Sequence, residues 1–95
     1  MQAIDAQTLA TKLSAQTVII DVREPDEFAA GHIPGATNVP LSEITSRLKE
    51  IPNDAYVVCQ SGARSAMATQ YLASQGIRVI NVTGGMLAWP AALEV

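Results

Sequence analysis

The chain of 95 residues is long enough for one domain with a single core, and 48% of its residues are apolar while 16% are charged. This balance is typical of a globular protein and excludes a disordered chain. The net charge of −3, with six scattered basic residues, argues against binding of nucleic acid. No apolar run approaches the ~20 residues of a membrane span, so we expect no direct membrane contact. The N-terminus lacks the basic and apolar segments of a signal peptide, which favours a cytoplasmic location.

Helical and β patterns alternate along the whole chain. Strand composition recurs in four short segments, which are residues 17–20, 37–39, 56–58 and 79–82. Helical patterns lie between and after them, at residues 6–14, 25–30, 42–51, 65–75 and 86–89. This alternation predicts an α/β fold, with a parallel sheet of four to five strands flanked by helices. We expect one domain over residues 1–95.

Particular residues support these boundaries. Asp5 is a suitable N-cap for the first helix, in which Leu9 and Leu13 lie four residues apart on the buried side. Ser42 can cap the third helix. The apolar residues of that helix keep helical spacing, and they are Ile44, Leu48 and Ile51. Gly76 is a fitting C′ residue for the fourth helix.

Cys59 is the one cysteine of the chain, and His32 is the one histidine. A single cysteine excludes an internal disulfide, and these two residues are too few for a zinc cluster. We therefore expect no metal ion and no cofactor. Whatever Cys59 binds covalently must be released by an outside molecule, because the chain has no second thiol.

The seven residues Cys59–Ser65, called the cysteine loop below, connect a buried strand to a helix. In an α/β fold such a loop lies at the carboxyl ends of the strands, where ligands bind. A short loop at a helix N-terminus turns several backbone N–H groups into one concavity, which suits an anion, and Gly62 permits a tight turn. The same field lowers the pKa of a thiol. The spacing therefore predicts a nucleophilic Cys59 in an anion-binding loop.

Several stretches of the chain together resemble the rhodanese (sulfurtransferase) family. They are Ile20–Glu24, Gly31–Ala36 and the cysteine loop, with Gly84-Gly85 and Trp89 as a further match. These matches cover nearly the whole chain in the family's order, and the chain is similar to single-domain members. The stretch Trp89–Val95 differs from the family's usual ending, where a glycine and a proline close the final turn.

The resemblance implies a thiosulfate sulfurtransferase. In that family the loop cysteine takes the outer sulfur of thiosulfate as a persulfide and passes it to a thiophilic acceptor. The implied partners are therefore a small anionic sulfur donor and an acceptor that is cyanide or a thiol. By this resemblance Cys59 is the nucleophile, and backbone N–H groups of the loop bind the donor and the persulfide. The residues that supply them are Gln60, Ser61, Gly62, Ala63, Arg64 and Ser65.

Three other interpretations stay open. Rhodanese-fold phosphatases separate the cysteine and arginine by five residues, whereas four separate Cys59 from Arg64, and the tighter ring suits a sulfane sulfur better than phosphate. Val58 stands where those phosphatases have a histidine, and no aspartate general acid is evident. An arsenate reductase would use the same loop with an external thiol. A rhodanese module could also serve sulfur delivery or interaction within a larger protein, membrane-attached in some family members.

Side chains in the loop have alternative roles. Arg64 can bind the sulfonate of the donor or pair with an acidic neighbour. The hydroxyls of Ser61 and Ser65 can reach the persulfide, and Ser65 can equally cap the following helix.

Other polar side chains are interpreted as structural. Asp21 is expected to form hydrogen bonds and ion pairs at the end of a central strand. His32 is assigned to a turn rather than to a dyad with the cysteine, and Trp89 to a lid over the core. An acidic group is expected to be the solvated start of a helix, and it consists of Glu24, Asp26 and Glu27.

Overall fold

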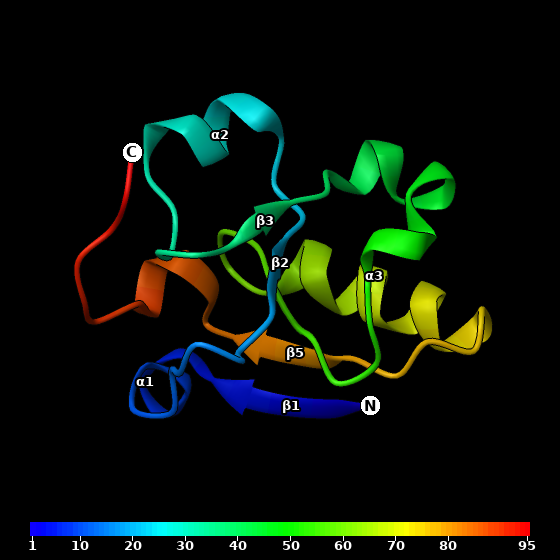
Figure 1. Cartoon of the computed structure of the whole chain (residues 1–95), viewed down its shortest axis with the longest axis horizontal. Coiled ribbons are helices and arrows are strands. Elements are labelled where there is room, and N and C mark those ends of the chain that lie inside the picture. The colour runs from blue at the N-terminus through cyan, green and yellow to red at the C-terminus, as the bar shows by residue number, and fades with distance from the viewer.

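A five-stranded parallel sheet forms the centre of the protein in this computed structural model, which describes residues 1–95 (Figure 1). The strands lie in the order β1-β5-β4-β2-β3, and every neighbouring pair is parallel. The α/β fold class and the parallel sheet are therefore confirmed. The strand bounds are Gln2–Asp5 for β1, Ile19–Asp21 for β2, Thr37–Asn38 for β3, Tyr56–Val58 for β4 and Ile80–Thr83 for β5.

Three α-helices and three 3-10 helices connect and follow the strands. The α-helices are α1 at Ala6–Ala10, α2 at Pro25–Ala30 and α3 at Ala63–Ser74. The 3-10 helices are η1 at Leu41–Ser46, η2 at Leu48–Glu50 and η3 at Gly85–Ala88. None of these helices combines the length and the apolar composition that crossing a membrane requires.

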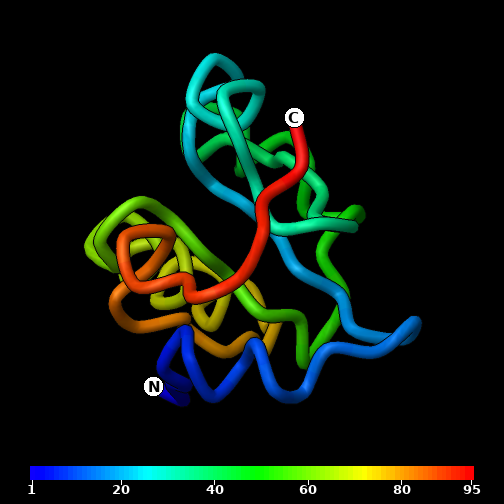
Figure 2. The backbone as a smooth tube through the Cα atoms, turned by 90° about the vertical axis from the view of Figure 1, so that its left-hand side faces the viewer, coloured from blue at the N-terminus to red at the C-terminus, as the bar shows by residue number.

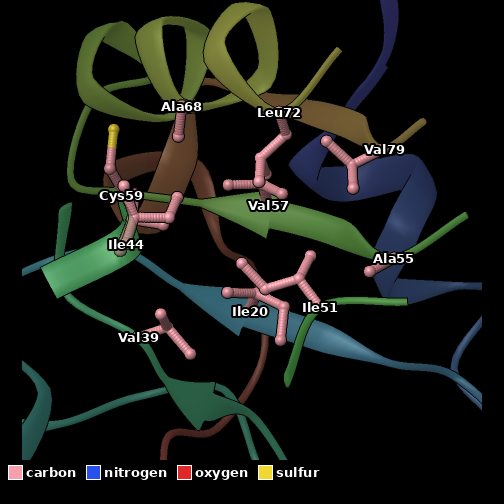
Figure 3. Packing of buried hydrophobic residues seen from close by; sticks show 11 residues of the cluster. Ile20, Val39, Ile44, Ile51, Ala55, Val57, Cys59, Ala68, Leu72 and Val79 are labelled. Carbon is pink, nitrogen blue, oxygen red and sulfur yellow. The ribbon is translucent and has the colours of Figure 1, made fainter. Parts of the chain in front are cut away.

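The central strand β4 is buried on both faces. Val57 packs in a cluster of 11 buried residues with Ala68 and Leu72, which reach down from α3 (Figure 3). Val58 points the other way, into a second cluster that contains Leu9 of α1. Alternate side chains of a strand face opposite sides of the sheet. Helices cover both sides of β4, so its side chains are buried and apolar on both faces. Because β4 is the middle strand of five, its carboxyl end, where the cysteine loop begins, lies between the carboxyl ends of its neighbours β5 and β2.

The edge strand β1 is absent from the predicted elements. Its side chains are mostly exposed, so the sequence shows no apolar alternation there. The strand pairs with β5 in a register that runs from Gln2 opposite Ile80 to Asp5 opposite Thr83. This strand forms because it pairs with β5, which lies 78 positions further along the chain. A local side-chain pattern does not reveal such distant pairing.

The first helix is shorter than predicted. Asp5 caps it as expected, because its carboxylate accepts the N–H of Thr8 at 2.8 Å. The helix ends well before residue 14, however, and Leu13 is 40% exposed rather than on a buried side. A hydrogen bond of 2.9 Å from the N–H of Ser14 to the hydroxyl of Thr17 turns the chain toward β2 instead.

The segment after β3 is a pair of 3-10 helices and not the predicted α-helix. Ile44 and Ile51 are buried as expected, and Leu48 is partly buried. Ser42 is not a cap, because its hydroxyl donates to the carboxylate of Glu24. The spacing of Leu48 and Ile51 fits a 3-10 turn as well as an α-helix, since residues three apart share a face in both. Ile44 lies in the separate helix η1.

The helix after the cysteine loop ends at the predicted glycine. Gly76 has φ of +80°, and its N–H donates to the carbonyl of Ala73 at 3.0 Å. The N–H of Ile77 donates to the carbonyl of Leu72 at 2.9 Å. Both bonds together form a Schellman motif, which satisfies carbonyls at the helix end. The helix begins at Ala63, two residues before the predicted start.

The C-terminal segment leaves η3 and runs across the molecule to the end of α2 (Figure 2). There the N–H of His32 donates to the carbonyl of Glu94 at 2.9 Å, and the N–H of Glu94 donates back at 2.8 Å. Trp89 at the start of this segment packs against the second cluster, which agrees with its interpretation as a core lid.

Packing on α3 yields a test of the core. Replacing the fully buried Leu72 by alanine is expected to lower the free energy of unfolding by about 2–5 kcal/mol, because it leaves a cavity between α3 and β4. Met67→Ala on the same helix is the matched control, since Met67 is 61% exposed and its loss should cost less than about 0.5 kcal/mol. Urea denaturation measures both. Equal costs for the two variants would contradict the assigned packing.

Candidate active site

Cys59 lies immediately after β4, at the carboxyl end of the central strand. Its side chain is 1% exposed and belongs to the cluster under α3. Figure 3 shows its sulfur beside the first turns of that helix. The sulfur of Cys59 therefore lies at the N-terminus of α3, as the strand-to-helix pattern predicts.

Backbone N–H groups of the cysteine loop point at this sulfur. The Sγ atom accepts the N–H of Gly62 at 3.1 Å and the N–H of Ser65 at 3.3 Å. Gly62 is the N-cap of α3 and has φ of +109°, a conformation that other residues rarely adopt. Because the chain reverses at Gly62, the loop can close around the sulfur.

The hydroxyl of Ser65 contacts the same sulfur. The thiol of Cys59 donates to Ser65 Oγ at 3.4 Å, and Ser65 Oγ donates to the carbonyl of Gly62 at 3.1 Å. A thiolate has no proton to donate, so in that state the hydroxyl can turn and donate to the sulfur. Ser65 is not a helix cap, because Gly62 takes that position. The hydroxyl of Ser61, by contrast, makes no hydrogen bond to the sulfur.

Further N–H groups of the loop are free to bind a ligand. Those of Gln60, Ala63 and Arg64 donate no hydrogen bond within the protein. Two of them belong to the first turn of α3, where the helix dipole adds partial positive charge. The loop therefore offers donors to an anion as well as to the sulfur itself.

Burial and hydrogen bonding shift the pKa of the Cys59 thiol in opposite directions. Burial is the largest single influence and raises the pKa, because it disfavours the charged thiolate. Hydrogen bonds from the hydroxyl and N–H of Ser65 and from the N–H groups of Gly62 and Ser61 lower it. The hydrogen bonds together outweigh burial, so the pKa of Cys59 lies below that of an ordinary thiol. The site favours the nucleophilic form of the residue.

A double glycine supports the loop from behind. The N–H of Met86 donates to the carbonyl of Cys59 at 2.9 Å, and the N–H of Leu87 donates to the carbonyl of Gln60 at 3.1 Å. A Cβ atom at Gly85 would overlap both carbonyl groups, so only glycine allows this close approach. The Gly84-Gly85 pair is the sequence signal for this contact, although its local pattern predicts only a loop.

A buried ion pair braces the other side of the loop. Arg23 donates to the carboxylate of Asp21 through Nη2 at 2.8 Å and through Nε at 3.1 Å. The same guanidinium reaches the carbonyl of Gly31 at 2.8 Å and, at 3.5 Å, the side-chain oxygen of Gln60. The structural interpretation of Asp21 agrees with this geometry, because both carboxylate oxygens are engaged by Arg23.

Arg64 forms a bidentate ion pair with Glu27 of α2. Its Nη1 and Nη2 atoms lie 2.7 and 2.9 Å from the two carboxylate oxygens. Hydrogen bonds from Arg64, and then from the N–H of Glu24, lower the pKa of Glu27 to about 2. The interpretation of this acidic group as a merely solvated helix start is therefore wrong for Glu27, and Glu24 accepts the hydroxyl of Ser42. Of the two roles expected for Arg64, the structure shows the pair with an acidic neighbour, and the sequence did not indicate that this neighbour is Glu27.

The lone histidine takes no part in the site. Its Nδ1 atom lies 2.9 Å from the carbonyl of Phe28, and the two rings stack with centroids 3.8 Å apart. Its Nε2 atom is 3.4 Å from the carboxylate of Glu94. His32 therefore joins α2 to the C-terminal segment, in agreement with its interpretation as a structural residue.

Comparison with known families decides the classification of this geometry. The family described as Rhodanese-like domain matches residues 5–92. The chain belongs to the rhodanese family. The cysteine loop and the supporting double glycine both lie inside the matched range.

Relatives of the chain include proteins named as sulfurtransferases. The chain is 44% identical over 91 residues to a sulfurtransferase of Allochromatium vinosum, a match that covers 90% of this chain and 85% of the relative. It is 38% identical over 90 residues to the thiosulfate sulfurtransferase GlpE of Pseudoalteromonas translucida, covering 92% and 86% of the two chains. At the level of the family, the protein is therefore a rhodanese-like sulfurtransferase.

One solved structure and one longer relative extend this comparison. The rhodanese-like domain protein from Staphylococcus aureus superposes with a TM-score of 0.92 at 39% identity, over 100% of this chain and 98% of that one. The chain is also 42% identical over 79 residues, or 80% of its length, to the putative sulfur carrier protein YrkF of Bacillus subtilis. It spans only 43% of the length of YrkF.

The contacts of the sulfur yield a test of its titration. Ser65→Ala is expected to raise the pKa of Cys59, because the variant keeps the burial that disfavours the thiolate and loses the hydroxyl that stabilises it. The ultraviolet absorbance of the thiolate as a function of pH measures the midpoint. Ser61→Ala is the matched control, since its hydroxyl does not contact the sulfur. An unchanged midpoint in Ser65→Ala would show that the hydroxyl has no such role.

Proposed function

We propose that the protein transfers a sulfane sulfur from thiosulfate or a related donor to cyanide or a thiol, through a persulfide on Cys59. The observation that carries this proposal is the environment of the sulfur. The buried Sγ atom accepts N–H groups from Gly62 and Ser65, and its pKa is lowered. A thiolate held among N–H donors can attack without a general base.

In the first half-reaction, the thiolate of Cys59 attacks the outer sulfur of the donor. A new S–S bond forms, and the bond between the outer sulfur and the rest of the donor breaks. For thiosulfate the leaving group is sulfite, which departs with the electron pair of the broken bond. The N–H groups of Gln60, Ala63 and Arg64, free of partners in the protein, are available to bind the charged donor.

In the second half-reaction, the acceptor attacks the outer sulfur of the persulfide. Cyanide leaves as thiocyanate, or a thiolate leaves as a new persulfide, and the thiolate of Cys59 is regenerated. The terminal sulfur of the persulfide carries negative charge, and the ring of N–H groups from Gln60 to Ser65 stabilises it. No net oxidation takes place, so the cycle needs no cofactor. A lone thiol of this kind suits the reducing cytoplasm, where it stays unpaired.

Contacts of the nearby carboxylates argue against a phosphatase. Such an enzyme needs an acid to protonate the leaving alcohol. Asp21 is engaged by Arg23 and Glu27 by Arg64, and neither carboxylate contacts Cys59. Val58, before the nucleophile, is buried in the second cluster. These contacts favour sulfur chemistry over hydrolysis of phosphate esters.

The relationship to YrkF favours a second role that rests on the same chemistry. Because the name of that longer relative is a putative sulfur carrier protein, we also propose that a persulfide on Cys59 can be delivered to a protein acceptor. Transfer to a thiol of a protein is chemically the same step as transfer to a small thiol. The same cysteine serves both proposals.

Cys59→Ser tests the role of the nucleophile. Sulfur transfer from thiosulfate to cyanide, measured as thiocyanate formed, is expected to fall by about 1,000-fold or more, because a serine hydroxyl is not ionised at neutral pH. The circular dichroism spectrum should stay that of the wild type. Turnover near the wild-type rate in the folded variant would contradict the assignment.

Length of the cysteine loop is tested by an insertion. A glycine placed between Ala63 and Arg64 widens the ring of N–H groups, so thiosulfate kcat/KM is expected to fall by about 100-fold. The wider ring can also allow binding of phosphate or arsenate. A glycine inserted after Gln75, at the far end of α3, is the control. If both insertions leave kcat/KM unchanged, loop length does not select the substrate.

A further inference from the structure

Both arginines next to the cysteine loop are paired with carboxylates. Arg23 is held by Asp21 at 2.8 Å, and this pair is buried. Arg64 is held by Glu27 at 2.7 Å through a bidentate contact that is partly exposed. A donor that enters the loop therefore meets two neutral pairs rather than two free cations.

Arg64 is the arginine placed to act on a bound donor. It is the second residue of α3, and the next residue, Ser65, donates its N–H to the sulfur of Cys59. Pairing with Glu27 is the largest influence that raises the pKa of Arg64, and the charge of Cys59 contributes as well. Arg64 thus directly precedes a residue that contacts the sulfur, and its charge is already matched by Glu27.

Carboxylates outnumber free cations on this side of the loop. Glu24 and Asp26 lie at the start of α2 with Glu27, and neither of them has an ion-pair partner. Attraction of an anion must therefore come from N–H groups of the loop and from the N-terminus of α3. These are partial charges only, so a full positive charge on an unpaired Arg64 would add an attraction that grows with the charge of the donor.

We propose that Glu27 is a specificity-determining residue, which masks the charge of Arg64 and directs the cysteine loop to sulfur donors of low charge. The proposal rests on the persulfide mechanism proposed above. Glu27 touches no reacting atom, and it acts on the donor through Arg64. Its removal leaves Arg64 unmasked beside the donor.

Two donors that differ by one charge separate this effect from general damage. Thiosulfate is a dianion, and attack by the Cys59 thiolate on its outer sulfur gives the persulfide and sulfite. Methanethiosulfonate is a monoanion, and the same attack gives the persulfide and methanesulfinate. In both cases one S–S bond forms, one breaks, and the leaving group keeps the electron pair. The ratio of the two kcat/KM values therefore measures preference for donor charge.

Glu27→Gln is the informative variant. The amide oxygen of glutamine can still accept a hydrogen bond from Arg64, so the guanidinium stays in place while its charge is uncovered. The ratio of kcat/KM for thiosulfate to that for methanethiosulfonate is expected to rise about fivefold, as for one charge interaction near a surface. Asp26→Asn is the matched control, because it removes one negative charge from the same turn without uncovering Arg64, and its ratio should stay near that of the wild type.

The double variant E27Q/R64Q provides a second test, should the single variant fail to fold. It replaces a neutral ion pair by two neutral amides, so the ratio is expected to stay within about twofold of the wild type. A fall of the ratio in the double variant would mean that Arg64 already binds the sulfonate in the wild type. That result, or an unchanged ratio in Glu27→Gln, or an equal rise in Asp26→Asn, would overturn the proposal.

Detection of a persulfide on Cys59 distinguishes failure of the proposed role of Glu27 from failure of the proposed sulfur transfer. If mass spectrometry detects a persulfide on Cys59 in the wild type and the ratios do not move, sulfur transfer stands and the role of Glu27 is wrong. If neither donor produces a persulfide on the folded wild-type protein, the proposed function fails, and the specificity proposal fails with it.

Discussion

The hydrogen bonds from backbone N–H groups to the sulfur of Cys59 are the contacts on which the rest of the site depends. The thiol of a cysteine residue that is 1% exposed would normally stay protonated, because burial disfavours the thiolate. The hydroxyl and N–H of Ser65, together with the N–H groups of Gly62 and Ser61, reverse that preference and lower the pKa of the thiol. The left-handed turn at Gly62 brings these donors toward the sulfur. The sheet contributes by ending β4 at the N-terminus of α3. The fold therefore acts on the chemistry of Cys59 through the hydrogen-bond donors that it places around the sulfur.

Three structural elements support this loop from different directions. The close approach of Gly85 fixes the carbonyl groups behind the sulfur, and the pair of Arg23 with Asp21 braces the side chain of Gln60. α2 contributes through the ion pair between Glu27 and Arg64. A buried ion pair such as that of Arg23 adds little net stability, since desolvation offsets its attraction. We infer that these contacts serve mainly to preorganise the loop.

Local signals predicted the elements that depend on neighbouring residues. The α/β alternation, the bounds of α2 at residues 25–30, the end of α3 at Gly76 and the turn after Cys59 all follow from residues that lie together in the sequence. Distant contacts were not predictable in this way. β1 exists because it pairs with β5, and Glu27 lies 37 residues from Arg64 in the chain. No propensity or spacing reports such a contact.

Mass spectrometry of the intact protein tests the central claim most directly. After brief incubation with thiosulfate the wild type should gain the mass of one sulfur atom, and cyanide should remove it. Cys59→Ser should show neither change, because the transferred sulfur is expected on the thiolate that the cysteine loop stabilises. A folded wild-type protein that gains no sulfur from thiosulfate or methanethiosulfonate, or a serine variant that gains as much as the wild type, would contradict the account.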